Sequence, residues 1–442
     1  MTRTIGMAAP KDKLYDPHRD ALYRKVAFRL MPLLIICYMA NVIDRTNVGI
    51  AQVHMSTDLN FSNTVYGFAV GIFYLGYILF EIPSNLLLDK MGVRKTLLRI
   101  MVLWGAMSAC TMLVRTPLEF YIVRFLLGLA EAGFWPGMLL YLTYWFPSGR
   151  RTQMISIFMM AIPISATVGP TLSGWIIHEM EGVVNMHGWQ WMFVLEGIPA
   201  VILGVVAFLY LDDRPSDANW LSSEEKSLIE EDLQAEQSTK VHGETYGLVQ
   251  MLLDYRVWVL GAITLGTYAL SNAITFWSPI IIQESGVESI VSIGLLTSVA
   301  PFVGAFVMLA VARSSDRLRE RRWHFSIAMF CASAALISLS IFYSSPLIVI
   351  AAITVATAGF YAGASVFSGI PAIYLSNRTR AGGIAMVTTI GAMAAMLSPI
   401  MMGWIRTSTG SFSLGLQISA GVVFTAGVVL LLAVPARSLR ES

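Results

Sequence analysis

Four charged residues stand inside long apolar stretches of this chain. Asp44 and Arg45 lie in the first such stretch, and Arg124 and Glu131 lie in the fourth. A charge inside hydrocarbon costs about 2.5–3.5 kcal/mol on insertion scales, so it persists where it faces a bundle interior or a watery cavity and has a partner. Two carboxylates and two guanidiniums in such stretches predict a protein that moves protons and an anion.

The spacing of these residues predicts how they face one another. Arg124 and Glu131 are seven residues apart and share one helix face, with about 10.5 Å between them along the axis. Asp44 and Arg45 are adjacent, so they point about 100° apart and need not pair. We expect their helix to end near Ile50, which places Asp44 and Arg45 near its outer end, at the depth of Arg124.

Each charged residue has a candidate role. Arginine presents a planar fork that matches a carboxylate and keeps its proton, so Arg45 is the candidate binder of a substrate carboxylate. Arg124 is a second cation that binds substrate or holds a carboxylate. Asp44 and Glu131 are candidate proton carriers, because a carboxyl group in an apolar site can bind and release a proton near neutral pH. The alternative is a structural cluster in which Asp44 pairs with Arg124 and Arg45 with Glu131.

The elements that position these residues are membrane-spanning helices. Of 442 residues, 56% are hydrophobic and 13% are charged, whereas soluble proteins are about a quarter charged. Apolar windows near the length of a spanning helix recur along the chain. They predict an all-α polytopic membrane protein with these spans: 26–50, 62–88, 96–114, 118–146, 152–178, 190–211, 256–283, 290–312, 323–343, 346–376, 380–405 and 412–435.

Several other classes of protein and site are not expected. The first apolar run is too long for a signal peptide and follows a long polar lead. Cys37, Cys110 and Cys331 share no metal-ligand spacing. The sequence contains no phosphate-binding glycine loop and no nucleophile motif. We therefore expect no enzyme activity, no cofactor, no metal site and no nucleic-acid partner.

The distribution of positive charge predicts the orientation. Lysine and arginine collect in cytoplasmic loops, and 22 of the 30 such residues fall on one side of the twelve spans. Both termini are then cytoplasmic. We favour a solvated linker for 221–237, although its Ser-Ser-Glu-Glu start is typical of a capped surface helix. The predicted organisation is a cytoplasmic segment 1–25, a half 26–211, a central loop 212–255, a half 256–435 and a tail 436–442.

The two halves repeat one another. Asp89 after the second span and Asp316 after the eighth are 227 residues apart, and Pro170 and Pro399 are 229 apart. Two sets of six helices joined by a long loop are the parallel repeats of one class of transporter. The residue 227 positions after Glu131 is Ala358, so the second half lacks this charge.

Several motifs resemble one known family. The segment Asp89-Lys-Met-Gly92-Val-Arg94-Lys95 resembles the signature loop of the major facilitator superfamily, with Asn85 where that family usually has glycine. The segments 43–49, 80–85 and 124–133 are similar to the anion:cation symporter family within it. The resemblance implies twelve helices in two halves, with a central cavity lined by the first, fourth, seventh and tenth. It also implies that the loop charges tie helix ends together in one conformational state.

The resemblance further implies a function and additional site residues. It is closest to bacterial permeases for tartrate, phthalate, hydroxyphenylacetate and sugar acids, which implies import of a small organic anion with protons. We expect a monomer in the lipid bilayer of the cell inner membrane. The further candidates are neutral groups for the substrate and charges for gating: Tyr77, Asn272, Tyr361 and Ser365 for binding, and Asp89, Gly92, Arg94, Lys95 and Asp316 for the signature loops.

Three other charged residues and two alternative functions complete the predictions. We expect Glu81 to pack against the signature-loop arginines, and Glu196 and Arg406 to lie at the outer interface. A proton-coupled drug exporter shares the fold, and Gly169-Pro170 partly matches the motif of such exporters. Paired arginines suit an anion better than a cationic drug. A membrane sensor or enzyme is the remote alternative.

Overall fold

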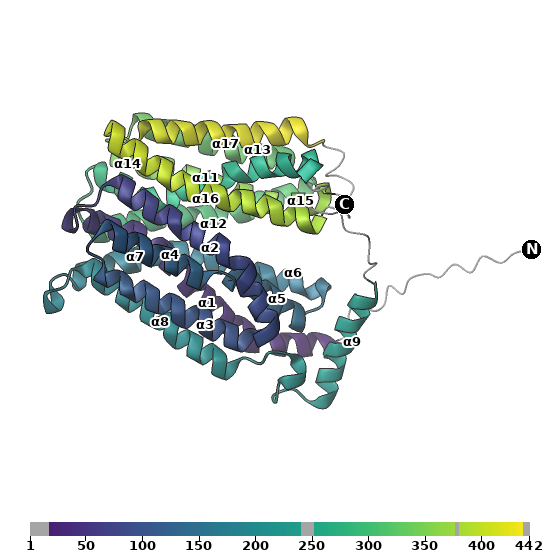
Figure 1. Cartoon of the computed structure of the whole chain (residues 1–442). Helices are drawn as coiled ribbons and strands as arrows, with labels where there is room; N and C mark the ends of the chain where they lie inside the picture. Colours follow the sequence, from purple (N-terminus) through teal and green to yellow (C-terminus); the bar gives the residue numbers. More distant parts are fainter. Residues whose placement is uncertain (1–16, 240–251, 376–379, 436–442) are drawn as a thin grey trace, which may run out of the picture.

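The computed structural model describes residues 17–239, 252–375 and 380–435, and the structure within them is helical without strands. Twelve helical segments of the described chain are long and apolar enough to cross a bilayer, which confirms the predicted fold class. Figure 1 shows two bundles side by side, with the first half in purple to teal and the second in green to yellow. Residues 1–16 of the predicted cytoplasmic segment, residues 240–251 of the predicted central loop and the predicted tail 436–442 lie outside the described residues.

In the first half, two of the six spans are divided into shorter helices. The fourth span consists of α4 and α5, and the fifth of α6 and α7. The helices are α1 (Pro17–Asp58), α2 (Asn63–Met91), α3 (Val93–Cys110), α4 (Pro117–Glu131), α5 (Phe134–Trp145), α6 (Ser148–Met159), α7 (Ala161–Glu179) and α8 (Gly188–Tyr210).

In the second half, one of the six spans is divided. The tenth span consists of α14 and the short α15, and the other spans are single helices. The helices are α11 (Tyr255–Glu284), α12 (Ile290–Leu318), α13 (Arg322–Ile341), α14 (Pro346–Phe367), α15 (Ile370–Tyr374), α16 (Arg380–Thr409) and α17 (Ser413–Ala433).

Helix α1 is longer than the sequence suggested. It continues from Ile50 to Asp58 without a break, although this part contains the polar residues Gln52 and His54. The placement of Asp44 near the outer end of its helix is therefore wrong. Gln52 is buried among neighbouring helices, and its amide atoms have no hydrogen-bond partner among the described residues.

The fourth span breaks immediately after Glu131. Ala132 leaves the helical conformation and Gly133 takes a φ of 89°, in the left-handed region that favours glycine. A Cβ atom on Gly133 would lie 2.3 Å from the Ser84 hydroxyl oxygen, so α2 packs tightly against the break. Glu131 is thus the last residue of α4, where the chain changes direction inside the bundle.

The two halves meet most closely at one end of the bundle, called here the far end, where α1 ends and α2 begins. A Cβ atom on Gly67 would lie 2.3 Å from the Pro399 carbonyl oxygen, and one on Gly294 would lie 2.4 Å from the Pro170 carbonyl oxygen. A hydrogen bond of 2.8 Å joins the hydroxyl groups of Thr171 and Ser298. In Figure 1 the two bundles separate toward the opposite end, the terminus end, where α1 begins and α17 ends. The far end is therefore closed by backbone contact.

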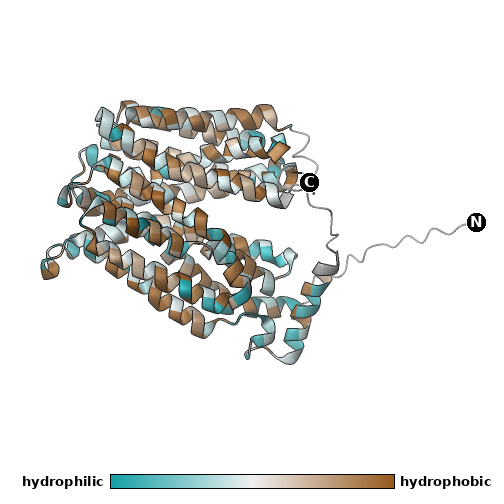
Figure 2. Ribbon diagram, in the orientation of Figure 1, coloured by the Kyte–Doolittle hydropathy of each residue, from teal (hydrophilic) through white to brown (hydrophobic). Residues whose placement is uncertain are grey.

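The segment predicted as a solvated linker contains a docked helix, α9 (Ser223–Thr239). Ser222 and Glu225 cap its start reciprocally, through bonds of 3.1 Å and 2.8 Å. Lys25 donates to Glu225 at 2.8 Å, and the Tyr23 hydroxyl donates to Asp232 at 2.9 Å. The linker interpretation is wrong for this helix, because opposite charges hold it to the start of α1. In Figure 2, α9 is among the most hydrophilic parts of the ribbon.

The signature loop joins α2 to α3 and is anchored to α8. The Arg94 backbone N–H donates to Asp213 Oδ1 at 2.9 Å, and its guanidinium donates to the Phe208 carbonyl oxygen at 2.7 Å. Gly92 lies between the helices with a φ of 83°. The backbone of Asp89 lies in the last turn of α2, but its side chain is outside the described residues. Lys95 is exposed, as is Asp316 in the equivalent loop of the second half.

Candidate functional site

The centre of the site is an ion pair between α1 and the end of α4. The Arg45 guanidinium pairs with Oε1 of Glu131, with Nε at 2.9 Å. Asn41, one helical turn before Arg45, donates its amide to the same oxygen at 2.5 Å. Glu131 is fully buried, whereas the Arg45 side chain is 29% exposed. The second carboxylate oxygen of Glu131 has no hydrogen-bond partner among the described residues.

Close packing of α2 against α4 positions the second arginine. A Cβ atom on Gly128 would lie 2.0 Å from the Phe73 carbonyl oxygen, and one on Gly76 would lie 2.3 Å from the Phe125 carbonyl oxygen. The helices approach closely because these positions have no side chain. The guanidinium carbon of Arg124 then lies 4.9 Å from the centre of the Phe73 ring.

Arg124 is fully buried and lacks a hydrogen-bond acceptor. None of its three guanidinium nitrogens has a hydrogen-bond partner in the described part of the chain. A buried cation without a counter-charge is costly, because the lost hydration is not replaced. The contact with Phe73 offsets part of this cost. The site therefore contains a positive charge that the described side chains do not neutralise by direct contact.

Asp44 faces away from the ion pair, toward α3. It accepts a hydrogen bond of 2.8 Å from the Trp104 indole nitrogen and another from the Ser108 hydroxyl. Its charge acts on Arg124, but no ion pair joins the two. The alternative of a structural cluster is therefore half present: Arg45 pairs with Glu131, and Asp44 is held by neutral donors. Asp44 and Arg45 point to different helices, as their 100° separation predicts.

Aromatic and amide groups connect this cluster to the second half. The Arg45 guanidinium carbon lies 5.2 Å from the centre of the Tyr77 ring. The Tyr74 hydroxyl donates to the Asn272 amide oxygen at 2.9 Å, which joins α2 to α11. The sequence-predicted residues Arg45, Tyr77 and Asn272 thus lie around one part of the interface between the halves.

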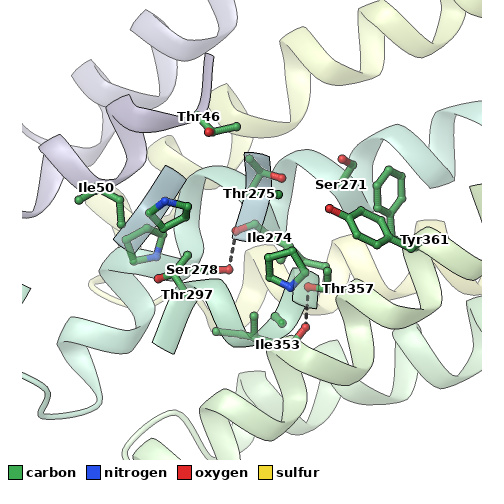
Figure 3. Close-up of a pocket in the computed structure, with 16 residues that line it drawn as sticks. Thr46, Ile50, Ser271, Ile274, Thr275, Ser278, Thr297, Ile353, Thr357 and Tyr361 are labelled. Carbon is green, nitrogen blue, oxygen red and sulfur yellow. Dashed lines mark hydrogen bonds between the residues drawn. The ribbon is translucent and has the colours of Figure 1, made fainter. Parts of the chain in front are cut away.

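A pocket lies between the halves beside Thr46, the neighbour of Arg45 (Figure 3). Its lining is mostly apolar, and helices α1, α7, α11, α12 and α14 contribute to it. The hydroxyl groups of Ser271, Thr275 and Tyr361 form no hydrogen bond with the described residues, so they are free for a ligand. Ser365, which was predicted with Tyr361, lies one turn farther along α14 and does not line this pocket.

Glu196 does not lie at the interface where the sequence placed it. Helix α8 begins at Gly188, so Glu196 is two turns inside the bundle and is only 7% exposed. Asn47 of α1 donates to one of its oxygens at 2.7 Å, and Ser173 of α7 donates to the other at 2.8 Å. The predicted start of this span, residue 190, differs from the start of α8 by only two residues. The prediction failed because hydropathy does not show that α1 and α7 pack over Glu196 and donate to it.

The predictions for the other two charged residues, Arg406 and Glu81, have different outcomes. Arg406 pairs with Glu284 at the far end, in agreement with its expected place at a helix end. Glu81 does not pack against the signature-loop arginines. The cation whose charge acts on Glu81 is Arg45, whereas Arg94 is bound to the end of α8. Glu81 follows Tyr77 by one helical turn and lies on the same side of α2. It therefore faces the ion pair between Arg45 and Glu131.

Sequence reasoning also missed the groups that hold the charged residues. Asn41 could have been found, because it lies four residues before Arg45 on the same helix face. Trp104 and Ser108 could not, because their contact with Asp44 depends on how α1 and α3 pack.

Comparisons with known proteins give the family. The sequence pattern of the Major Facilitator Superfamily matches residues 34–377. The protein named "Putative tartrate transporter" of Agrobacterium vitis is 40% identical over 92% of this chain and 93% of its own length. A quinolone resistance transporter of Acinetobacter baumannii is 36% identical over 96% of this chain and 97% of its own.

The fold is also found among solved structures. The inward-open xylose transporter of Escherichia coli superposes with a TM-score of 0.73 at 15% identity, covering 91% of this chain and 96% of its own. That identity bears on the fold alone. With the matched family pattern, full-length relatives and twelve apolar helices, the chain is a multi-pass membrane transporter, not an enzyme, and belongs to the Major Facilitator Superfamily.

Proposed function

We propose that this protein imports a small organic carboxylate together with protons across the cell inner membrane, as a monomer with both termini in the cytoplasm. The observation that carries the proposal is Arg124, a fully buried guanidinium without a hydrogen-bond partner among the described residues. A carboxylate offers the planar, bidentate partner that this group lacks. The name of the 40% identical relative, a tartrate transporter, supports the same substrate class.

Competition for Arg45 couples the proton to the substrate in this proposal. Glu131, when ionised, occupies the Arg45 guanidinium through Oε1. Protonation removes the charge of Glu131 and weakens this pair, so that Arg45 becomes available to the substrate carboxylate. Proton binding thus precedes substrate binding, and release of the substrate restores the ion pair.

Asp44 is the second proton carrier of the proposal. The groups that hold it, Trp104 and Ser108, are neutral, so no cation fixes its charge by direct contact. Two carriers, Asp44 and Glu131, allow two protons to accompany one monoanion. Positive charge then moves inward with each cycle, and a negative-inside potential drives accumulation.

The pocket beside Thr46 is the place proposed for the body of the substrate. Its free hydroxyls on Ser271, Thr275 and Tyr361 can bond to polar groups of a small acid. Neither Arg45 nor Arg124 lines this pocket. In this proposal the carboxylate reaches them from the pocket when the pair between Arg45 and Glu131 opens. The closed far end corresponds to a state open to the cytoplasm, and rocking of the halves gives alternating access.

Uptake into proteoliposomes tests the proposal. Purified protein is supplied with radiolabelled tartrate, phthalate, hydroxyphenylacetate and a sugar acid, with the outside acidic or neutral and with or without a potassium-diffusion potential. We expect accumulation of at least one acid that rises with an acidic outside and rises again with a negative-inside potential. Uptake that does not depend on the proton gradient or on the membrane potential contradicts proton coupling. Uptake that depends on the proton gradient alone indicates a single proton carrier for a monoanion.

Drug export is the second candidate function. The quinolone resistance transporter that is 36% identical favours it, as does the Gly169-Pro170 pair in α7. The same vesicles distinguish the two candidates. Quinolone movement coupled to opposing proton flux, without uptake of any acid, supports the exporter.

A further inference from the structure

Glu196 is a buried carboxyl group that the proposed transport mechanism does not use. It contacts three helices of the first half: its own α8, α1 through Asn47, and α7 through Ser173. Both donors are neutral, and no ion pair reaches Glu196 within the described residues. An ionised carboxylate at this place is therefore buried without a counter-charge, which is costly.

The hydrogen bonds of Glu196 can be satisfied in its protonated form as well. The amide oxygen of Asn47 is buried and has no hydrogen-bond partner among the described residues. The oxygen and nitrogen of an asparagine amide are interchangeable by a half-turn of the side chain. In the turned orientation, the Asn47 oxygen accepts the proton of a Glu196 carboxylic acid, and Ser173 still donates to the other oxygen. The site thus accommodates a proton without moving a helix.

The groups around Glu196 define its electrostatic environment. Asp44, one turn before Asn47 on α1, is the charged group that acts on it. Helix α3 presents Gly105 and Ser108 at this level, where α8 packs through Gly197. The titratable residues on α3 and α7 lie toward helix ends: Arg94, Lys95, Arg99 and Cys110 on α3, and the exposed His178 and Glu179 on α7.

The same segments that bind Glu196 close the far end. Ser173 lies between Thr171, which bonds to Ser298 of α12, and Gly174, whose Cβ would lie 2.8 Å from the Ile290 carbonyl oxygen. Asn47 lies two residues before Gly49, whose Cβ would lie 3.4 Å from the Phe276 carbonyl oxygen of α11. Both residues that donate to Glu196 therefore lie within three residues of a contact between the halves.

We propose that Glu196 is a third proton-binding site, whose proton stabilises closure of the far end. When the far end is closed, Glu196 is buried and the protonated form is favoured. When α7 moves away from α12 and also shifts against α1 and α8, the Ser173 side of the carboxyl group is uncovered, water reaches it and its ionised form becomes tolerable. Because a proton binds the closed state better, acid shifts the population toward closure. The inference rests on the proposed proton-coupled transport only in assigning this proton to its cycle.

Distance measurements between spin labels test this site without any substrate. The labels are placed on cysteines at the exposed positions Val184 and Glu288, which flank the α7–α12 contact, with the native cysteines replaced by alanine. The background is D44N/E131Q, so that the other two carboxyls do not titrate. Between about pH 5.5 and about pH 8.5, we expect the open-to-closed ratio to rise, by up to tenfold per pH unit, the limit for one linked proton.

Adding Glu196→Gln should abolish this pH response and leave the far end closed, because glutamine mimics the neutral acid. Glu179→Gln, an exposed carboxyl at the end of α7, is the matched control and should retain the response. Ser173→Ala tests the site if Glu196→Gln does not fold: it removes a donor that supports the ionised form, so the transition should move to higher pH.

Two results overturn the inference: a pH response that survives Glu196→Gln, or a D44N/E131Q background that has none. Uptake experiments in the same vesicles separate it from the transport proposal. If uptake ignores the proton gradient while the label distance still depends on Glu196, the transport proposal fails and the proton site stands.

Discussion

The two halves of this transporter share one architecture but differ in chemistry. The first half places Asp44, Arg45, Arg124 and Glu131 within its bundle, whereas the second contributes hydroxyl and aromatic groups to the pocket between the halves. The position equivalent to Glu131 is Ala358. Charge inside a bilayer is costly, so charged residues retained there mark functional sites. The difference supports a division in which the first half binds charge and the second binds the body of the substrate.

The loops at the terminus end differ in a similar way. Gly92 joins α2 to α3 with a φ of 83°, and the residue 227 positions later, Arg319, takes a φ of 49° between α12 and α13. A Cβ atom on Gly92 would lie 2.8 Å from the Asp213 carboxylate, so the first loop is locked against α8. The second loop uses a non-glycine residue in a left-handed conformation, and Asp316 beside it is exposed.

The largest expected effect is the loss of uptake in Arg124→Met. Hydrogen bonds to a charged group contribute about 1.5–3 kcal/mol, so substrate affinity should fall by roughly 10- to 150-fold. Thermal stability without substrate should not fall, since the substitution removes an uncompensated buried charge. Binding is measured by isothermal titration and stability by a thermal melt. Arg115→Met, at an exposed arginine, is the control. A large loss of stability with unchanged affinity would mean that Arg124 is structural.

The next largest effect is expected for Arg45→Lys, which tests substrate binding separately from proton coupling. Arg45→Lys keeps the charge but loses the planar fork, so affinity should fall by roughly tenfold, the equivalent of about 1.4 kcal/mol. The pairing of Arg45 with Glu131 predicts that the pH dependence of binding changes as well. Unchanged affinity at every pH, in a folded and inserted protein, would remove Arg45 from the binding site.

Glu131→Gln should abolish accumulation driven by a pH gradient, because the variant cannot carry a proton at this position. Counterflow exchange needs no net proton movement and should survive better. Asp44→Asn should behave in the same way if both carboxyls are carriers. The measurements are gradient-driven uptake and counterflow in the same vesicles. A Glu131→Gln protein that still concentrates substrate would exclude this residue as a carrier.

The two loops can be compared by a matched pair of substitutions. Gly92→Ala forces a Cβ into a conformation that costs of order 1–3 kcal/mol and against the Asp213 carboxylate, so it should lower the thermal stability. Arg319→Gly relieves a left-handed conformation and should leave stability unchanged or raise it by up to about 1 kcal/mol. Equal destabilisation by both substitutions would contradict the difference between the loops.

The second half should affect selectivity rather than coupling. Tyr361→Phe and Ser271→Ala each remove one free hydroxyl, and a neutral hydrogen bond contributes about 0.5–1.5 kcal/mol, equivalent to a change of roughly 2- to 12-fold. We expect the change for substrates that carry hydroxyl groups and none for those that lack them. The response to a proton gradient should be retained. Loss of proton coupling in either variant would contradict the proposal that the second half contributes only to substrate selectivity.

The smallest effect concerns α9. The Lys25 ammonium, hydrogen-bonded to Glu225, and the Ser222 backbone N–H hold the pKa of this carboxyl below its usual range. Its contribution to docking is therefore present above the ordinary glutamate pKa and is lost as the pH falls through the lower folded value. Lys25→Ala should increase cleavage of α9 by protease at neutral pH, with uptake unchanged within about twofold. Altered transport kinetics would indicate that α9 takes part in gating.

The sequence alone determined the twelve helices, the two halves and the four central charges, because length, hydropathy and the cost of buried charge are local properties. It also determined that Asp44 and Arg45 diverge, since adjacent residues on a helix do so. The tertiary structure decided which partners the charged groups find. Whether Asp44 meets Arg124 or Trp104 depends on how α1 packs against α3 and α4, and no spacing along the chain encodes that choice.

The same reason explains Glu196 and Arg124. Hydropathy could place Glu196 near the start of a span, but only the packing of α1, α7 and α8 shows that it is buried between Asn47 and Ser173. Likewise, an arginine in an apolar helix is visible in the sequence. That it lies fully buried without a hydrogen-bond acceptor among the described residues follows only from the three-dimensional arrangement, because burial and satisfaction of a side chain are set by its neighbours.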